Sequence, residues 1–270
     1  MKPLAVFLWH TISDDPPSWV APFAVGKRTF LGQLDAVVDS GRPVVTARQV
    51  VAARRGGPAL PPDAVALTFD DGYLDFAETV APALAARSLP AALFVTTGAL
   101  RPHHRSALPE APMLSMDEVI ELDGSGIDIC SHAHVHEQLD TLPPQRITQE
   151  LLIPKWILEE GLGHAVRLYA YPYGYSSAEV RTRTRTTGYL GSFAVRNAFS
   201  PTDDDPYRIA RLMVRHATPP DTFAAWLAGT GAPTATTHEH PKTTLWRDYR
   251  RGRARLHAGK GESSWLFTAG

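Results

Sequence analysis

The stretch that decides the fold reads Val65-Ala66-Leu67-Thr68-Phe69-Asp70-Asp71-Gly72. Its first five residues form a nearly continuous apolar run, which is typical of a β-strand covered on both faces. Adjacent side chains leave an extended strand in opposite directions, so the two carboxylates reach one centre only if the chain turns, and Gly72 permits that turn. The stretch therefore predicts a buried strand that ends in a functional site or, more simply, in an Asp-Gly turn.

Outward from this strand, short apolar runs alternate with amphipathic helical patterns to about residue 230. Such alternation favours right-handed crossovers and a mostly parallel sheet, so the predicted fold class is α/β, as a barrel or a doubly wound sheet. The predicted strands are residues 4–9, 65–69, 91–96, 127–130, 168–171, 190–195 and 209–214.

Three of the predicted helices carry start and stop signals. Thr29 precedes an apolar stripe that Gly41 ends, which predicts a helix between them. Ser115-x-x-Glu118 and Ser176-x-x-Glu179 both have the spacing of capping boxes, in which side chains satisfy the free amides of a first helical turn. The helix after Ser176 should end near Gly188.

Composition excludes several classes of protein. With 44% apolar and 20% charged residues among 270, the chain can form a sizeable core and is neither disordered nor a coiled coil. A net charge of −1 gives no support to nucleic-acid binding, and no apolar stretch is long enough to span a membrane. Cys130 is the only cysteine, and the apolar run at residues 4–9 is too short for a signal peptide. We therefore expect a soluble, cytoplasmic protein.

The composition changes near residue 230, so we predict a catalytic domain at 1–230 and a C-terminal extension at 231–270. The extension begins with small polar residues and continues with a basic segment. This segment has seven cations (Lys242, Arg247, Arg250, Arg251, Arg253, Arg255 and Lys260) against Asp248 alone. It is interpreted as a solvated tail or docked terminal helix, or as an electrostatic handle for an anionic partner. Trp246, Tyr249 and Trp265 indicate that part of it docks.

Chemically reactive side chains gather where the predicted strands end. Asp70 and Asp71 follow one strand, three histidines at 132, 134 and 136 follow another, and Tyr173 follows a third. His10 ends the first strand and His216 follows the last. Because parallel strands share one carboxyl edge, these residues predict a single site on that edge.

Two histidines and a carboxylate in this site predict a catalytic metal centre. His132 and His136 have the spacing of one helical face, whereas His132 and His134 would share one face of an extended chain. Either pair with one aspartate leaves open positions for substrate and water. Such a set suits zinc, but also cobalt, nickel or iron. The second aspartate would then lie beside the metal as a general base.

Three motifs in order resemble the polysaccharide deacetylases, the NodB-like enzymes of carbohydrate esterase family 4. The motifs are Thr68-Phe69-Asp70-Asp71-Gly72-Tyr73, His132-x-x-x-His136 and Tyr171-Pro172-Tyr173-Gly174. The resemblance extends from residue 4 to about 228 and includes Trp9-His10. It implies a distorted (β/α) barrel of seven or eight mostly parallel strands and metal-dependent removal of N-acyl groups from amino sugars.

By this resemblance, Asp71, His132 and His136 are the metal ligands, Asp70 is the general base, and the Tyr173 N–H binds the oxyanion. The arginine that pairs with the base in many members is replaced, since the matching stretch reads Ala170-Tyr171. Arg211 is the candidate partner instead.

The family's usual Leu-x-His-Asp motif, which supplies a general-acid histidine, is not recognisable. His216 is the first candidate for this role and His10 the second.

The predicted function is thus removal of an N-acyl group, usually acetyl, from a small amino sugar or related intermediate of a cytoplasmic biosynthetic pathway. Zinc is the expected metal, the substrate is the expected partner, and neither nucleic acid nor membrane is expected. The alternatives are a hydrolase of cyclic amides or ureides and a non-catalytic carbohydrate-binding barrel.

Overall fold

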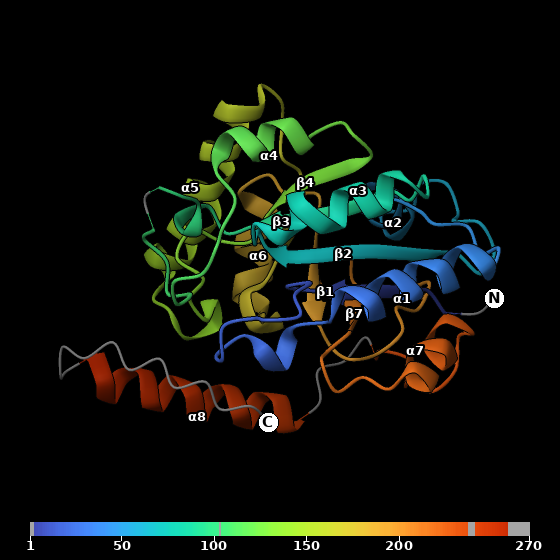
Figure 1. Ribbon diagram of the computed structural model, residues 1–270. Helices are drawn as coiled ribbons and strands as arrows, with labels where there is room; N and C mark the ends of the chain where they lie inside the picture. The colour runs from blue at the N-terminus through green and yellow to red at the C-terminus, as the bar shows by residue number, and fades with distance from the viewer. Residues whose placement is uncertain (1–2, 103, 237–240, 259–270) are drawn as a thin grey trace.

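The computed structural model describes residues 3–102, 104–236 and 241–258. Within these residues, seven parallel strands close into a barrel in chain order, with helices packed around it (Figure 1). The strands are β1 Ala5–Trp9, β2 Val65–Asp71, β3 Ala91–Val95, β4 Ile127–Ser131, β5 Leu168–Ala170, β6 Gly191–Val195 and β7 Ile209–Met213. The predicted (β/α) barrel is confirmed.

Strand β2 runs two residues further than its apolar run predicts. Asp70 pairs with Phe94 and Asp71 with Val95 of β3, and every residue of β2 is buried. The rings of Trp9 and Phe69 stack with centroids 5.3 Å apart and pack against Phe30 of the first helix, on the outer side of the barrel wall. Asp70 leaves the strand on the opposite side from Phe69, so its carboxylate lies inside the barrel, where it meets Arg211.

Helices connect most of the strands. They are α1 Lys27–Asp39, α2 Ala47–Arg54, α3 Ala81–Ala85, α4 Met116–Leu122, α5 Pro144–Leu162, α6 Ala178–Thr186, α7 Pro220–Leu227 and α8 Pro241–Ala258. Short helical turns lie at η1 Ala21–Phe23, η2 Phe76–Val80, η3 Thr97–Ala99, η4 Leu139–Thr141 and η5 Pro172–Gly174. None of the helices in the described part of the chain is long and apolar enough to cross a membrane.

One of the two predicted capping boxes forms. Ser115 accepts from the Glu118 amide and Glu118 reaches back to the Ser115 amide. The other box is wrong by one residue, because Ser177, not Ser176, caps α6 by accepting from Val180. The start predicted at Thr29 is also wrong. α1 begins two residues earlier, after Gly26, where the Asp14 carboxylate accepts from the Lys27 amide at 2.9 Å.

Helix α8 docks on the body of the barrel through a buried aspartate. Asp140 of η4, 2% exposed, accepts from both terminal nitrogens of Arg250 at 2.7 Å and from Arg247 Nε at 3.3 Å. Arg251 donates to the Asp140 carbonyl at 2.7 Å. Three of the seven predicted cations of the electrostatic handle are thus used within the chain. Lys260 and Trp265, also named in that prediction, lie outside the described residues.

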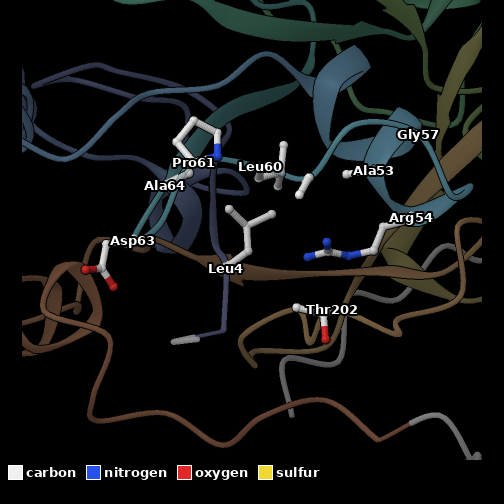
Figure 2. A pocket seen from close by; sticks show the side chains of 10 residues that line it. Leu4, Ala53, Arg54, Gly57, Leu60, Pro61, Asp63, Ala64 and Thr202 are labelled. Atoms are coloured by element: carbon white, nitrogen blue, oxygen red, sulfur yellow. The ribbon is translucent and has the colours of Figure 1, made fainter.

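A cavity of about 200 Å³ opens at the amino end of the barrel, the end opposite to Asp70 and Asp71 (Figure 2). Leu4 lines it just before β1 and Ala64 just before β2, which places it at the start of the strands. Leu60 and Pro61 form its apolar wall, with Arg54 facing them.

Candidate active site

Asp71, His132 and His136 meet at the carboxyl end of the barrel. Asp71 Oδ1 lies 3.5 Å from His132 Nε2 and 3.3 Å from His136 Nε2. One ligand atom from each residue lies within 4.8 Å of the others, and all three residues are buried. Asp71 Oδ1 has no hydrogen-bond partner in the structure, and a buried oxygen left in that state is costly. A cation between the three side chains would satisfy this oxygen, so the donor set fits a metal ion.

The two histidines are brought together by a loop and not by the predicted helical face. Ala133 and His136 adopt left-handed backbone angles, with φ of 68° and 69°, and turn the chain back after β4. His134, the rival ligand, points elsewhere, and its Nδ1 lies 2.9 Å from Thr97 Oγ1. The pair is therefore His132 and His136, although the helical reason for expecting it is wrong.

The protonation states around this centre suit metal binding. Burial lowers the pKa of His132 to about 4, although the charge of Asp70 acts in the opposite direction. Burial raises the pKa of the Asp71 carboxyl, but the imidazoles around it, His136 foremost, outweigh this and hold it well below its usual range. His132 Nδ1 lies 2.8 Å from the Ala170 carbonyl, which directs Nε2 toward Asp71. A neutral imidazole and a carboxylate are the forms that bind metals.

Asp70 is held by the arginine that the sequence proposed for it. Arg211 Nη1 and Nη2 donate to the two carboxylate oxygens of Asp70 at 2.7 Å each, and the arginine is fully buried. Asp70 Oδ2 lies 3.7 Å from His132 Nε2, so the carboxylate adjoins the candidate ligand set. Burial raises the pKa of Asp70, but the Arg211 charge outweighs it and keeps the pKa below its ordinary value. The carboxylate is therefore ionised at neutral pH.

A strained turn after β5 places Tyr173 beside the histidines. Tyr173 has a φ of 59°, and its ring centroid lies 4.9 Å from that of His136. Gly174 follows with a φ of 74°, and a Cβ atom there would lie 2.3 Å from the backbone nitrogen of Val195. Only glycine fits this close approach, so the turn depends on Gly174.

The structure separates the two candidates for the general acid. His10 is half-buried at the end of β1, where burial lowers its pKa while the charges of Asp71 and Asp70 raise it. His216 is exposed on the loop after β7, where its amide donates to the Pro22 carbonyl. In the described contacts, no interaction joins the His216 side chain to the centre. The sequence predicts His216 as the first candidate, but of the two histidines only His10 is under the influence of the Asp71 and Asp70 charges in the described contacts.

The site geometry agrees with a family comparison. The family model described as Polysaccharide deacetylase matches residues 57–191, half of the chain. The chain belongs to the polysaccharide deacetylase family. The matched residues include the Asp70-Asp71 pair, both histidines and the Tyr173 turn. Members of this family are hydrolases that cleave carbon–nitrogen bonds other than peptide bonds, so this chain is a hydrolase of that class.

Individual relatives extend the comparison beyond the matched segment. The chain is 22% identical to the "Putative polysaccharide deacetylase YxkH" of Bacillus subtilis (strain 168), over 83% of this chain and 76% of that protein. It is 36% identical to the poly-beta-1,6-N-acetyl-D-glucosamine N-deacetylase of Escherichia coli (strain K12), over 31% of this chain and 12% of that protein. The structure of IcaB from Ammonifex degensii superposes with a TM-score of 0.74 and 26% identity, covering 86% of this chain and 98% of IcaB.

Two acids that support this site, the buried Glu150 and the half-buried Asp75, were missed in the sequence. Glu150 of α5 accepts from the amides of His134 at 3.0 Å and Val135 at 2.7 Å, which fixes the ligand loop. Asp75 accepts from the Ile12 amide at 2.9 Å and from the Thr11 hydroxyl, which fixes the chain just after His10. Glu150 could have been found, because it lies in the buried stripe of α5 among apolar residues.

Proposed function

We propose that this protein is a metal-dependent deacetylase that hydrolyses the N-acetyl amide of glucosamine units in a polysaccharide. The observation that carries the proposal is the buried set of Asp71, His132 and His136 directly beside the Asp70–Arg211 pair. This arrangement puts a cation-binding group and an ionised base within one site at the carboxyl end of the barrel. Both are what amide hydrolysis requires, because water is a poor nucleophile and an amine a poor leaving group.

Asp71, His132 and His136 would hold the metal ion. When bound there, a divalent ion lowers the pKa of water and polarises the acyl carbonyl. Zinc suits two imidazoles and a carboxylate, as do cobalt, nickel and iron.

Asp70 is the proton acceptor in this proposal. Its carboxylate is ionised and held by Arg211, so it can take a proton from the attacking water. The water oxygen bonds to the acyl carbon, and the bond from that carbon to nitrogen breaks. His10 then passes the proton from Asp70 to the departing nitrogen, which yields a free amine and acetic acid. His10 is the candidate for this transfer because it follows β1 at the carboxyl end of the barrel, where burial lowers its pKa more than the charges of Asp71 and Asp70 raise it.

Tyr173 supplies the remaining group through its backbone. The left-handed turn at Tyr173 and Gly174 sets the direction of the Tyr173 amide beside His136. We assign this N–H to the oxyanion that forms on the acyl oxygen. A donor placed in this way typically contributes about 3 kcal/mol to lowering the barrier.

The relatives favour a polymer over the small intermediate expected from the sequence. The Escherichia coli relative is named for a poly-N-acetylglucosamine substrate and shares 36% identity over 83 residues. Glucosamine polymers and small amino sugars present the same amide, so the site chemistry is common to both. The choice of a polymer therefore depends on binding outside the catalytic centre.

Amine release from a substrate panel tests the proposal. The panel is a β-1,6-linked N-acetylglucosamine hexamer, N-acetylglucosamine itself and a cyclic ureide. We expect the metal-loaded protein to release amine from the hexamer, and Asp70→Asn to lose at least about 100-fold in kcat while still binding metal. Asp203→Asn, an exposed aspartate in the loop after β6, is the matched control and should be unaffected. Turnover of the cyclic ureide alone, or of none of the three, would contradict the proposal.

A further inference from the structure

Helix α8 presents an aromatic face that its docking leaves uncovered. Leu245, Trp246 and Tyr249 are 69%, 43% and 54% exposed. The rings of Trp246 and Tyr249 are stacked, with centroids 5.2 Å apart and planes at 24°. Large apolar side chains that cluster on a surface mark binding sites more often than scattered ones do. The α8 segment lies outside the ring of helices that surrounds the barrel (Figure 1).

The opposite face of α8 is firmly anchored. Arg247 and Arg250 are buried against Asp140, and the Arg250 guanidinium lies 3.6 Å from the ring centroid of Tyr175. Asp140 belongs to η4, which closely follows the loop that carries His132 and His136. The anchoring therefore fixes the position of Trp246 and Tyr249 relative to the catalytic centre.

A continuous series of aromatic contacts leads from the candidate metal centre to this face. Tyr173 contacts His136, and the rings of Tyr173 and Tyr175 are nearly parallel at 6.2 Å. Trp246 Nε1 then donates to the Tyr175 hydroxyl at 3.2 Å. Tyr173 and Tyr175 are only half-buried. The exposed pair on α8 is thus an extension of the catalytic site and not a separate surface.

We propose that Trp246 and Tyr249 form a binding subsite for N-acetylated sugar units of the polymer, beyond the unit that is deacetylated. This inference rests on the proposed function and names the part of the molecule that selects a polymer. Flat aromatic rings with a polar edge match the apolar C–H faces and hydroxyl edges of hexose rings. A single sugar at the metal centre would not reach α8, whereas a chain of sugars would follow Tyr173 and Tyr175 to it.

Charge on α8 favours acetylated over deacetylated units. The described side chains of the helix include four arginines against Asp248. Arg247 and Arg250 share the Asp140 carboxylate, and the Arg253 guanidinium lies 5.9 Å from the ring centroid of Tyr249. A deacetylated glucosamine unit carries an ammonium group at neutral pH, which this helix repels. The uncharged N-acetyl unit meets no such repulsion.

Binding measured without turnover tests the subsite. Asp70→Asn provides an inactive background, in which we compare Trp246→Ala/Tyr249→Ala with Trp156→Ala, an equally drastic change at a 66% exposed tryptophan on α5. By calorimetry, the double substitution should weaken binding of the β-1,6-linked N-acetylglucosamine hexamer about tenfold, since two stacking contacts are lost. Trp156→Ala should leave hexamer affinity unchanged. The fully deacetylated hexamer should bind the unsubstituted background more weakly than the acetylated one.

In the active protein, the double substitution should lower kcat/KM for the hexamer by the same factor and leave that for N-acetylglucosamine unchanged. Equal hexamer affinity with and without the aromatic pair would overturn the subsite, even if amine release upholds the proposed function. A dimer that dissociates on the double substitution, with hexamer affinity retained, would show that a second copy covers this face and would also overturn it. If the double substitution weakens hexamer binding but the metal-loaded wild type releases no amine, the subsite is upheld and only the proposed function is contradicted.

Discussion

The two ends of the barrel bury different kinds of side chain. At the carboxyl end, Asp70, Asp71 and His132 are each no more than 3% exposed, and the chain there is locally strained. Five non-glycine residues at this end have left-handed backbone angles, namely Asp71, Ala133, His136, Tyr173 and Asn197. The amino end has a cavity of about 200 Å³, which mostly apolar side chains line. The difference teaches that buried charge locates the chemistry, whereas a hollow alone does not.

Replacing one arginine at each end should give the largest contrast. Arg211→Met leaves the Asp70 carboxylate buried without its partner, which should lower the free energy of unfolding by about 3–5 kcal/mol. Arg54→Met at the amino-end cavity removes contacts of 3.4 Å to Ser200 and a longer-range attraction to Asp204, and should cost about 1 kcal/mol. Urea unfolding of both variants measures the two losses. Equal losses would mean that the buried Asp70–Arg211 pair contributes no more to stability than the weak contacts of Arg54.

Two glycines with nearly the same backbone angle make a second contrast. Gly174 at the site and Gly163 at the end of α5 have φ of 74° and 71°, but only Gly174 is crowded, by Val195. Gly163→Ala should destabilise the protein by about 1 kcal/mol, the ordinary cost of a left-handed alanine. Gly174→Ala should cost about 2–3 kcal/mol and reduce kcat about 100-fold, because the Tyr173 amide is displaced. A normal kcat in Gly174→Ala would remove Tyr173 from the mechanism.

The smallest predicted effect concerns the charge of Asp75, which holds the chain beside His10. Burial raises the pKa of this carboxyl to about 6, although its hydrogen bonds to Thr11 and Ile12 act in the opposite direction. Because the folded-state pKa lies above the unfolded value of about 4, the wild type loses stability relative to Asp75→Asn as pH rises from about 4 to about 6.

The quantity to measure is the free energy of unfolding of Asp75→Asn minus that of the wild type. Above pH about 6, this difference should be about 1–2 kcal/mol more positive than at pH about 4. Urea unfolding at the two pH values measures this difference, and titration of other groups cancels in the comparison. A difference that is independent of pH would show that Asp75 titrates normally.

Much of the barrel could be predicted from the sequence, because strands buried on both faces leave continuous apolar runs. The runs at β1 and β3 mark their strands within a residue. The end of β2 was placed too early because Asp70 and Asp71 are charged, yet both continue the ladder with β3. Helix starts were less certain, since the sequence places two serines side by side at 176 and 177 and only backbone geometry selects Ser177.

The candidate site was predictable in its residue types and less so in its geometry. Spacing alone does not distinguish a helix from the turned loop at Ala133 and His136, because left-handed angles at these residues have no sequence signature. The sequence could not show where His216 and His10 lie relative to the site, because the direction of each loop is set by contacts such as that of Asp75 with Thr11. The docking of α8 on Asp140 joins residues over 100 positions apart, and no local pattern indicates it.

Metal content of three purified proteins tests the central claim most directly. Prepared without chelators, the wild type and Asp70→Asn should each contain about one equivalent of a divalent metal by elemental analysis, and His136→Ala should contain almost none. Such a result would support Asp71, His132 and His136 as the metal ligands and leave Asp70 the role of proton acceptor. Full metal occupancy in His136→Ala, or none in the wild type, would contradict the account.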